Sequence, residues 1–404
     1  QELGINQIQC MPVYEFEDRI RFASNYWGYG EAYCFAPKKR YAKGNPVREL
    51  KEMVYSCHKA GIEVVLHLPF FDEMPKQKMI ECLRYYRQEY HVDGFIVNPY
   101  TVPLEVIQSD DYLKHMKLIV KNEDFQNVMR RFLKGDEGMV ESVIWHLKHL
   151  SQNDYQYHTI TDHTGFTLND LVSYDGKHNE RNGENNHDGP DYNYSWNCGV
   201  EGETEDPAVL ALRKRMMENA FAVLLCSRGT PMFLSGDEFG DTRYGNNNPY
   251  CQDNPISWLD WTLLEKNRPL FEFVKYMIAF RKRHPAIRMD LPSDRFSFPS
   301  VSLHGVHPWQ PVLNEDSHIL CVLFSGSDQE QTEQDTVYLA INTYWEPASL
   351  LLPDLPFEWC WQIAVNTGDP SGPAFSEDTM PEASHTVLLG ERSVILFVAK
   401  RRSV

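Results

Sequence analysis

The sequence predicts an α/β protein, a TIM-type (β/α)8 barrel followed by an antiparallel β-sandwich. Over the first two thirds of the chain, apolar strand-like runs alternate with helical stretches, which is the order of elements in a (β/α) barrel. After His284 and Pro285, short β-rich runs are separated by Pro, Gly, Ser and acidic stretches, a pattern that favours a separate sandwich. We therefore expect a barrel over residues 1–290 and a sandwich over residues 291–404.

The first barrel elements follow from hydrophobic periodicity. Residues 5–13 are predicted as a strand and residues 46–60 as a helix that stops at Gly61. The apolar face of this helix is predicted to carry Val47, Leu50, Val54 and Cys57. Residues 62–70 form a nearly continuous apolar run, as expected for a parallel strand covered on both faces.

The later elements continue the alternation. A helical stretch with Met79, Ile80, Leu83, Tyr86 and Tyr90 in register precedes predicted strands at 94–97 and 118–120. Further strands are predicted at 157–162 and 230–235, and helices at 207–226 and 271–283. In the sandwich, strands are predicted at 317–323, 336–341 and 393–399, with the polar and acidic residues 325–334 as a solvated turn.

Composition excludes several classes of function. The formal net charge of −18 argues against a nucleic acid partner, because such proteins use Lys and Arg to neutralise phosphates. The nine cysteines are scattered without CxxC pairs, so neither a disulfide framework nor a metal site is indicated, and we expect a cytoplasmic protein without a cofactor. No apolar run reaches the length of a membrane span.

Several long, irregular strings carry a specific resemblance. They are NYWGY at 25–29, GFTLNDLVSY at 165–174, KHNE at 177–180, NGENN at 182–186, NYSWNCGVEG at 193–202, GNNN at 245–248 and YCQDN at 250–254. With HGV at 304–306 and NTYWEP at 342–347, they make the chain similar to the bacterial glycogen debranching enzymes and isoamylases of the α-amylase superfamily. The resemblance runs from about Leu3 into the sandwich.

This resemblance implies hydrolysis of α-1,6 branch linkages in glycogen or limit dextrins by the retaining mechanism. Retaining hydrolysis needs two carboxyl groups about 5 Å apart, a nucleophile and an acid/base, around an oxocarbenium-like transition state. In the family a third carboxylate holds the sugar hydroxyls. The implied ligand is an α-glucan or maltooligosaccharide. By analogy with catalytically silent relatives, the implied protein partner is an active debranching or glycogen-metabolism enzyme.

The chain departs from the family at all three carboxylates. Asn98 stands at the position of the nucleophile, Lys121 at that of the acid/base, and Thr164 at that of the third carboxylate. An amide has no charge with which to attack an anomeric carbon, and an ammonium opposes the positive charge that develops on the sugar. Loss of one positioned acid or base costs about 10²- to 10⁴-fold, so the resemblance implies a degenerate site without efficient hydrolysis.

Remaining sugar contacts are predicted from residues that survive in the family strings. Tyr26, Trp27 and Tyr29 follow the strand at 5–13 and offer ring faces for glucose, and His163 stands where the family binds a sugar hydroxyl. An equally weighted alternative assigns Trp27 and Tyr29 to local core packing. The Asn-rich strings are predicted to be loop scaffolding, and Cys198 and Cys251 to be packing thiols.

Two other hypotheses stay open at this stage. In the first, relocated carboxylates make an active glycosidase; the candidates are Asp72, Glu73, Glu123, Asp124, Asp237 and Glu238, with Asp162 placed deeper, inside the barrel. The competing interpretation is that these groups cap helices or pair with cations. In the second hypothesis, Lys121 marks a pocket for an anionic sugar ligand.

The family pattern also implies two architectural changes. Only a short connection joins residues 71 and 92, where the family has a long loop after the third strand, so we expect a shallower cleft. The strand at 5–13 matches the second strand of the family, which implies that the first strand is missing and that a seven-stranded barrel exposes an unpaired edge.

Overall fold

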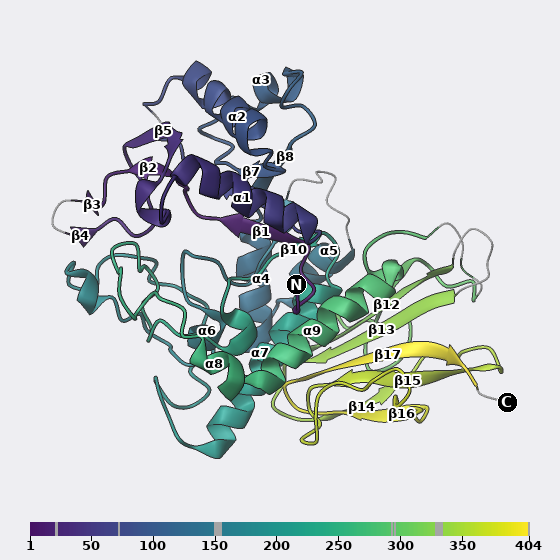
Figure 1. Ribbon diagram of the computed structural model, residues 1–404. Helices are drawn as coiled ribbons and strands as arrows, with labels where there is room; N and C mark the ends of the chain where they lie inside the picture. Colours follow the sequence, from purple (N-terminus) through teal and green to yellow (C-terminus); the bar gives the residue numbers. More distant parts are fainter. Residues whose placement is uncertain are drawn as a thin grey trace.

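The computed structural model describes residues 1–20, 23–71, 73–148, 156–291, 294, 296–327 and 334–402. A parallel sheet of six strands forms its first half (Figure 1). Its neighbours follow chain order: β1 (Gln7–Cys10), β6 (Glu63–His67), β7 (Gly94–Ile96), β8 (Lys117–Lys121), β9 (Gln156–His158) and β10 (Thr230–Pro231). The predicted α/β class is confirmed, and the sheet is an open half-barrel with β1 and β10 at its edges.

The described sheet has one strand fewer than the seven expected. After β8 the chain forms two helices, α4 (Glu123–Lys134) and α5 (Val140–Lys148), before it returns as β9. β8 pairs directly with β9 through Val120 with Gln156 and Lys121 with Tyr157. The carboxyl ends of β8 and β9 therefore lie side by side, which decides the geometry of the candidate site.

The remaining helices cover this sheet or lie within the connections between its strands. They are α1 (Pro46–Lys59), α2 (Lys76–Tyr90), α3 (Leu104–Ser109), α6 (Leu168–Leu171), α7 (Pro207–Cys226), α8 (Thr262–Lys266) and α9 (Arg268–Arg283). Short 3-10 turns occur at η1 (Lys39–Tyr41), η2 (Glu180–Asn182), η3 (Asp237–Phe239) and η4 (Pro285–Ile287). Two small ribbons, β2 (Tyr14–Phe16) with β5 (Ala32–Pro37) and β3 (Arg19–Ile20) with β4 (Ala23–Ser24), lie between β1 and α1.

Helix α1 shows how local signals fix an element. The side chain of Asn45 accepts a hydrogen bond from the backbone N–H of Arg48, and Pro46 opens the helix. Leu50 and Val54 are buried as predicted. The prediction for Val47 was wrong, because this side chain at the first turn is 39% exposed.

The C-terminal part is two antiparallel sheets. Five strands are ordered β11 (Val301–His304), β12 (Ile319–Ser327), β13 (Gln334–Asn342), β17 (Ser393–Arg401) and β15 (Trp359–Asn366), and β14 (Ala348–Leu351) pairs with β16 (Thr386–Leu389). Of the turn predicted at 325–334, residues 328–333 lie outside the described residues, and residues 325–327 and 334 belong to β12 and β13. Hydrophobic packing between the two sheets includes Cys321 and Leu323, whose side chains alternate with those that face the helices.

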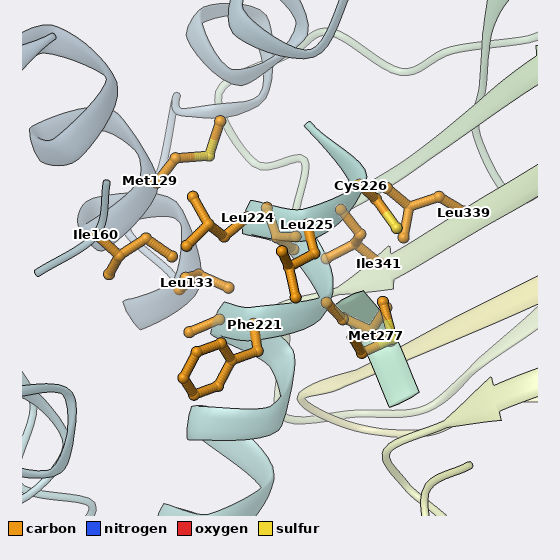
Figure 2. Packing of buried hydrophobic residues seen from close by; sticks show 14 of the residues in the cluster. Met129, Leu133, Ile160, Phe221, Leu224, Leu225, Cys226, Met277, Leu339 and Ile341 are labelled. Carbon is orange, nitrogen blue, oxygen red and sulfur yellow. The ribbon is translucent and has the colours of Figure 1, made fainter. Parts of the chain in front are cut away.

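One apolar core joins the half-barrel to the C-terminal sheet. Figure 2 shows Met129 and Leu133 of α4 near Phe221 and Leu224 of α7, with Leu339 and Ile341 of β13 approaching from the other side. Helices α7 and α9 lie between the two parts (Figure 1), so the five-stranded sheet packs on them. None of the helices in the described part of the chain has the length and apolar character needed to cross a membrane.

Candidate functional site

The candidate site lies where the parallel strands end. His67 and Lys121 are the last residues of β6 and β8, and His163 lies in the loop after β9. Carboxyl ends of parallel strands gather at one edge of the sheet, where barrel enzymes build their sites. The turn after β4 contributes Trp27 and Tyr29 to the same place.

An ion pair joins the end of β8 to the loop after β9. Nζ of Lys121 lies 2.7 Å from Oδ2 of Asp162. The other oxygen, Oδ1, accepts hydrogen bonds from the backbone N–H of Thr164 at 2.8 Å and from its hydroxyl at 2.7 Å. The side chain of Asp162 is 3% exposed and that of Lys121 is 21% exposed, so the carboxylate is held inside and the ammonium covers it.

The sequence prediction for Asp162 needs a correction. β9 ends at His158, four residues earlier than expected, and Asp162 therefore lies in the following loop and not on the strand. It is buried, as expected, yet it meets the end of β8. Burial alone would raise the pKa of Asp162, but the charge of Lys121 and the hydrogen bonds from Lys121 and Thr164 hold it below its usual value.

Four rings pack beside this ion pair. The hydroxyl of Tyr29 shares a hydrogen bond of 2.7 Å with Nε2 of His163. Ring centroids lie 5.1 Å apart for Trp27 and His163, 5.3 Å for His67 and His163, and 5.7 Å for Tyr29 and His67. The structure thus brings together three of the predicted residues and adds His67, which the sequence had not marked as a sugar contact.

Burial keeps this cluster uncharged at neutral pH. It lowers the pKa of His163 to about 4 and that of His67 to about 3, and it raises the pKa of Tyr29. Neutral imidazole and phenol groups donate and accept hydrogen bonds, so they suit the hydroxyls of a neutral sugar. Trp27 is buried, which favours the packing role for that residue, whereas Tyr29 is half-buried.

Tyr26 and Asn98 form hydrogen bonds with residues outside the ring cluster. The hydroxyl of Tyr26 donates to the carbonyl of Ser257 at 3.3 Å, and its backbone N–H donates to the carbonyl of Tyr250. Asn98 follows β7 in an exposed turn, where its Oδ1 accepts from the backbone N–H of Tyr100 at 2.9 Å. Its amide stabilises a turn, which is a common role for Asn.

Behind the cluster, charged groups hold the loop of His163. Nη1 of Arg243 donates to the carbonyl of His163 at 3.1 Å, and the backbone N–H of Arg243 donates to Asp170 at 2.9 Å. Arg130 of α4 is buried and donates to the carbonyl of Ile160 at 2.7 Å. The sequence analysis did not identify either arginine. The signal that could have identified them is a charged residue inside an otherwise apolar or asparagine-rich stretch.

The Asn-rich strings and two cysteines have the predicted roles. Asn182 donates to the carbonyl of Asn248 at 2.9 Å, and Asn247 donates to the carbonyl of Pro190 at 2.8 Å, which confirms the loop scaffolding. The carbonyl of Asn247 accepts from Gly165 at 2.9 Å, so this network also anchors the loop of the site. Cys198 and Cys251 are buried free thiols.

The other carboxylates have structural partners. Glu123 lies in the first turn of α4, which Asn122 caps, and Asp124 pairs with His146 at 3.0 Å. Asp237 is buried and accepts hydrogen bonds from the backbone of Leu168 and the hydroxyl of Thr161. Glu238 accepts from Gly236, Glu73 is exposed, and Asp72 lies outside the described residues. These contacts favour capping and pairing over a relocated catalytic pair.

Comparisons with known proteins show which proteins the chain is similar to. No protein-family model matches the chain. The "Glycogen operon protein GlgX homolog" of Mycobacterium tuberculosis is 34% identical over 383 residues, 71% of this chain and 53% of the relative. "Isoamylase 3, chloroplastic" of Oryza sativa subsp. japonica is 33% identical over 506 residues, 99% of this chain and 63% of the relative. This chain thus spans between about half and two thirds of their length.

Solved structures agree at the level of the fold. A pullulanase from Bacillus acidopullulyticus has a TM-score of 0.71 at 18% identity, over 98% of this chain and 54% of that one. Pullulanase type I from Bacillus subtilis, solved with maltose, gives the same TM-score and identity over 99% of this chain and 63% of that one. By sequence the chain is therefore a homologue of GlgX, isoamylase and glycogen debranching enzyme, and the solved structures show that it has the fold of the pullulanases.

Proposed function

We propose that this chain acts in α-glucan metabolism as a glucan-binding member of its family that has no efficient hydrolytic activity. The observation that carries the proposal is the ion pair between Lys121 and Asp162. It fills the place of the acid/base with a cation and neutralises the nearest buried carboxylate. Retaining hydrolysis needs a protonated acid and a free nucleophile on either side of the bond, and this pair supplies neither.

The chemistry of the other two positions supports the same proposal. Asn98 has no negative charge and its amide oxygen is engaged by Tyr100. Thr164 has no charge with which to hold a sugar, and its hydroxyl already donates a hydrogen bond to Asp162. An oxocarbenium-like transition state develops positive charge, and the ammonium of Lys121 would raise its energy.

The ring cluster supports binding. Tyr29 and His163 join a phenol and an imidazole in one hydrogen bond, beside the ring of Trp27. Apolar ring faces and neutral donors suit a sugar, whose ring has apolar faces and hydroxyl edges. The pullulanases that share the fold include one solved with maltose and one with maltotetraose, which makes a maltooligosaccharide the natural probe.

Calorimetry with a branched maltodextrin tests both parts of the proposal. We expect saturable injection heats without sustained heat flow, and no increase in reducing ends over hours. The variant Tyr29→Ala should weaken binding, and Tyr55→Ala, an exposed side chain on α1, is the matched control. Sustained heat that Asp162→Asn abolishes would contradict the proposal and support a relocated active site.

Three finer expectations remain predictions. An anionic sugar at Lys121 has less support, since this ammonium already pairs with Asp162. An active debranching partner is still an expectation from the family alone. A cytoplasmic location is supported by the nine cysteines, all of which are free thiols.

A further inference from the structure

A second aromatic feature lies on the C-terminal part, apart from the half-barrel site. Two of its three rings, Tyr344 and Trp345, lie in the turn between β13 and β14, and the third, His318, directly precedes β12. The centroids of His318 and Tyr344 lie 5.0 Å apart with ring planes 26° from parallel, and those of Tyr344 and Trp345 lie 3.8 Å apart with planes inclined by 30°. Trp345, the outermost ring, is 60% exposed.

The backbone beneath these rings is fixed by a buried amide. Asn342 donates through Nδ2 to the carbonyls of Glu346 at 2.8 Å and Gly390 at 2.9 Å, and its Oδ1 accepts from the backbone N–H of Tyr344 at 2.9 Å. Because the turn is held on three sides, binding to the ring of Trp345 needs little additional ordering, and such preorganisation favours affinity.

Further hydrogen bonds tie the turn to both of its neighbours. The backbone N–H of Thr343 donates to the carbonyl of His318 at 3.0 Å, and that of Arg392 donates to the carbonyl of Tyr344 at 2.9 Å. These bonds fix the position of His318 under Tyr344 and bring residues 391 and 392 beside the turn. Hydrogen bonds therefore hold the backbone of the stack in place within the sandwich.

The surroundings of the stack favour a neutral polyol as its occupant. Glu346 follows Trp345 and is exposed, and Glu391, next to Arg392, is 51% exposed and pairs with Arg215 at 3.2 Å. Carboxylate oxygens accept hydrogen bonds from hydroxyls and repel anions, and the whole chain carries a formal charge of −18. A pyranose ring places its C–H face on an aromatic ring and its hydroxyls at the edge, where acceptors can bind them.

We propose that the stack of His318, Tyr344 and Trp345, which we call the sandwich platform, is a second binding site for an α-glucan chain. The inference rests on the proposed function for the choice of glucan. In this arrangement the half-barrel site and the sandwich platform bind separate stretches of one polymer, so the affinity for glycogen exceeds that for a short oligosaccharide because the second contact is intramolecular.

Affinity electrophoresis in gels with and without glycogen tests the inference. We expect Trp345→Ala to weaken retardation roughly tenfold, since Trp is enriched among the contact residues whose truncation weakens binding most, and Trp345→Phe to retain most of it. Phe357→Ala is the matched control, because Phe357 is 94% exposed on the same part of the chain. Thermal unfolding of each variant checks that it is folded.

Adding Tyr29→Ala separates the two proposals. Retardation lost in Trp345→Ala but kept in Tyr29→Ala would support the platform and contradict sugar binding in the half-barrel. Retardation lost only in Tyr29→Ala would overturn the platform and leave the proposed function intact. Equal losses in Trp345→Ala and Phe357→Ala would also overturn the platform, and a native chain that is not retarded at all would overturn both.

Discussion

Nζ of Lys121 and Oδ2 of Asp162 are 2.7 Å apart across the carboxyl ends of two adjacent strands. The ammonium completes a buried arrangement in which Thr164 supplies the other two hydrogen bonds to the same carboxylate. Lys121, Asp162 and Thr164 are thus joined to one another.

Breaking this pair should destabilise the fold. Lys121→Met leaves Asp162 buried without its cation, and removal of one partner of a buried pair costs about 3 kcal/mol or more. The double variant Lys121→Met with Asp162→Asn should recover a large part of that loss, since Asn still accepts from Thr164. Urea unfolding of the four proteins in the cycle measures the coupling free energy, and additive losses would show that the pair contributes nothing.

If Asn98 and Lys121 hold the positions given to them in the proposed function, Asn98→Asp alone should not restore hydrolysis. Asn98 is exposed and accepts from the backbone of Tyr100, a role that Asp fills equally well, so the free energy of unfolding of Asn98→Asp should change by about 0.5 kcal/mol or less. Lys121 would still stand in the place of the acid. A reducing-end assay with a branched maltodextrin should stay at background, and clear turnover by this single variant would contradict the role given to Lys121.

Asp237 should make the protein less stable as the pH rises. Burial raises the pKa of Asp237 to about 7, above the value of about 3.9 in an unfolded chain. Between these two values the folded state binds more protons than the unfolded state, so the free energy of unfolding falls with pH by at most about 1.4 kcal/mol per unit. Asp237→Asn should remove this component, and unfolding at pH 5 and pH 8 compares the two proteins.

The sequence predicts long, continuous elements well. α7 has the predicted bounds because Asp206 caps it, Pro207 opens it and its apolar residues continue to Cys226. Helix α4 was missed, although Asn122 followed by Glu123 and Asp124 is a helix-start signal.

The contacts of the site were harder to predict. The pairing of Lys121 with Asp162 depends on β8 lying next to β9, although two helices separate these strands in the chain. It also depends on β9 ending at His158. An apolar run in the sequence does not show at which residue the strand ends and the loop begins. Tyr29 and His163 were both predicted as sugar contacts from the sequence. The hydrogen bond between them is evident only from the structure.

His163 should act on stability with the opposite sign to Asp237. Its pKa is lowered to about 4, with burial as the main cause, whereas a histidine in an unfolded chain has a pKa of about 6.5. As the pH falls from 6.5 towards 4 the unfolded state takes up a proton that the folded state does not, so the protein loses stability. His163→Asn has no such proton, so the free energy of unfolding of the native chain relative to this variant should fall as the pH falls across this range.

Above pH 7 that difference should be constant, because His163 is neutral in both states. Glucan binding by the native chain should likewise hold steady from pH 8 to about 5, since the hydrogen bond between His163 and Tyr29 keeps its protonation state. Calorimetric titration with maltohexaose across this range checks the second point. A loss of affinity centred near pH 6.5 would mean that His163 titrates as an exposed histidine does, which the packing of Trp27, Tyr29 and His67 around it argues against.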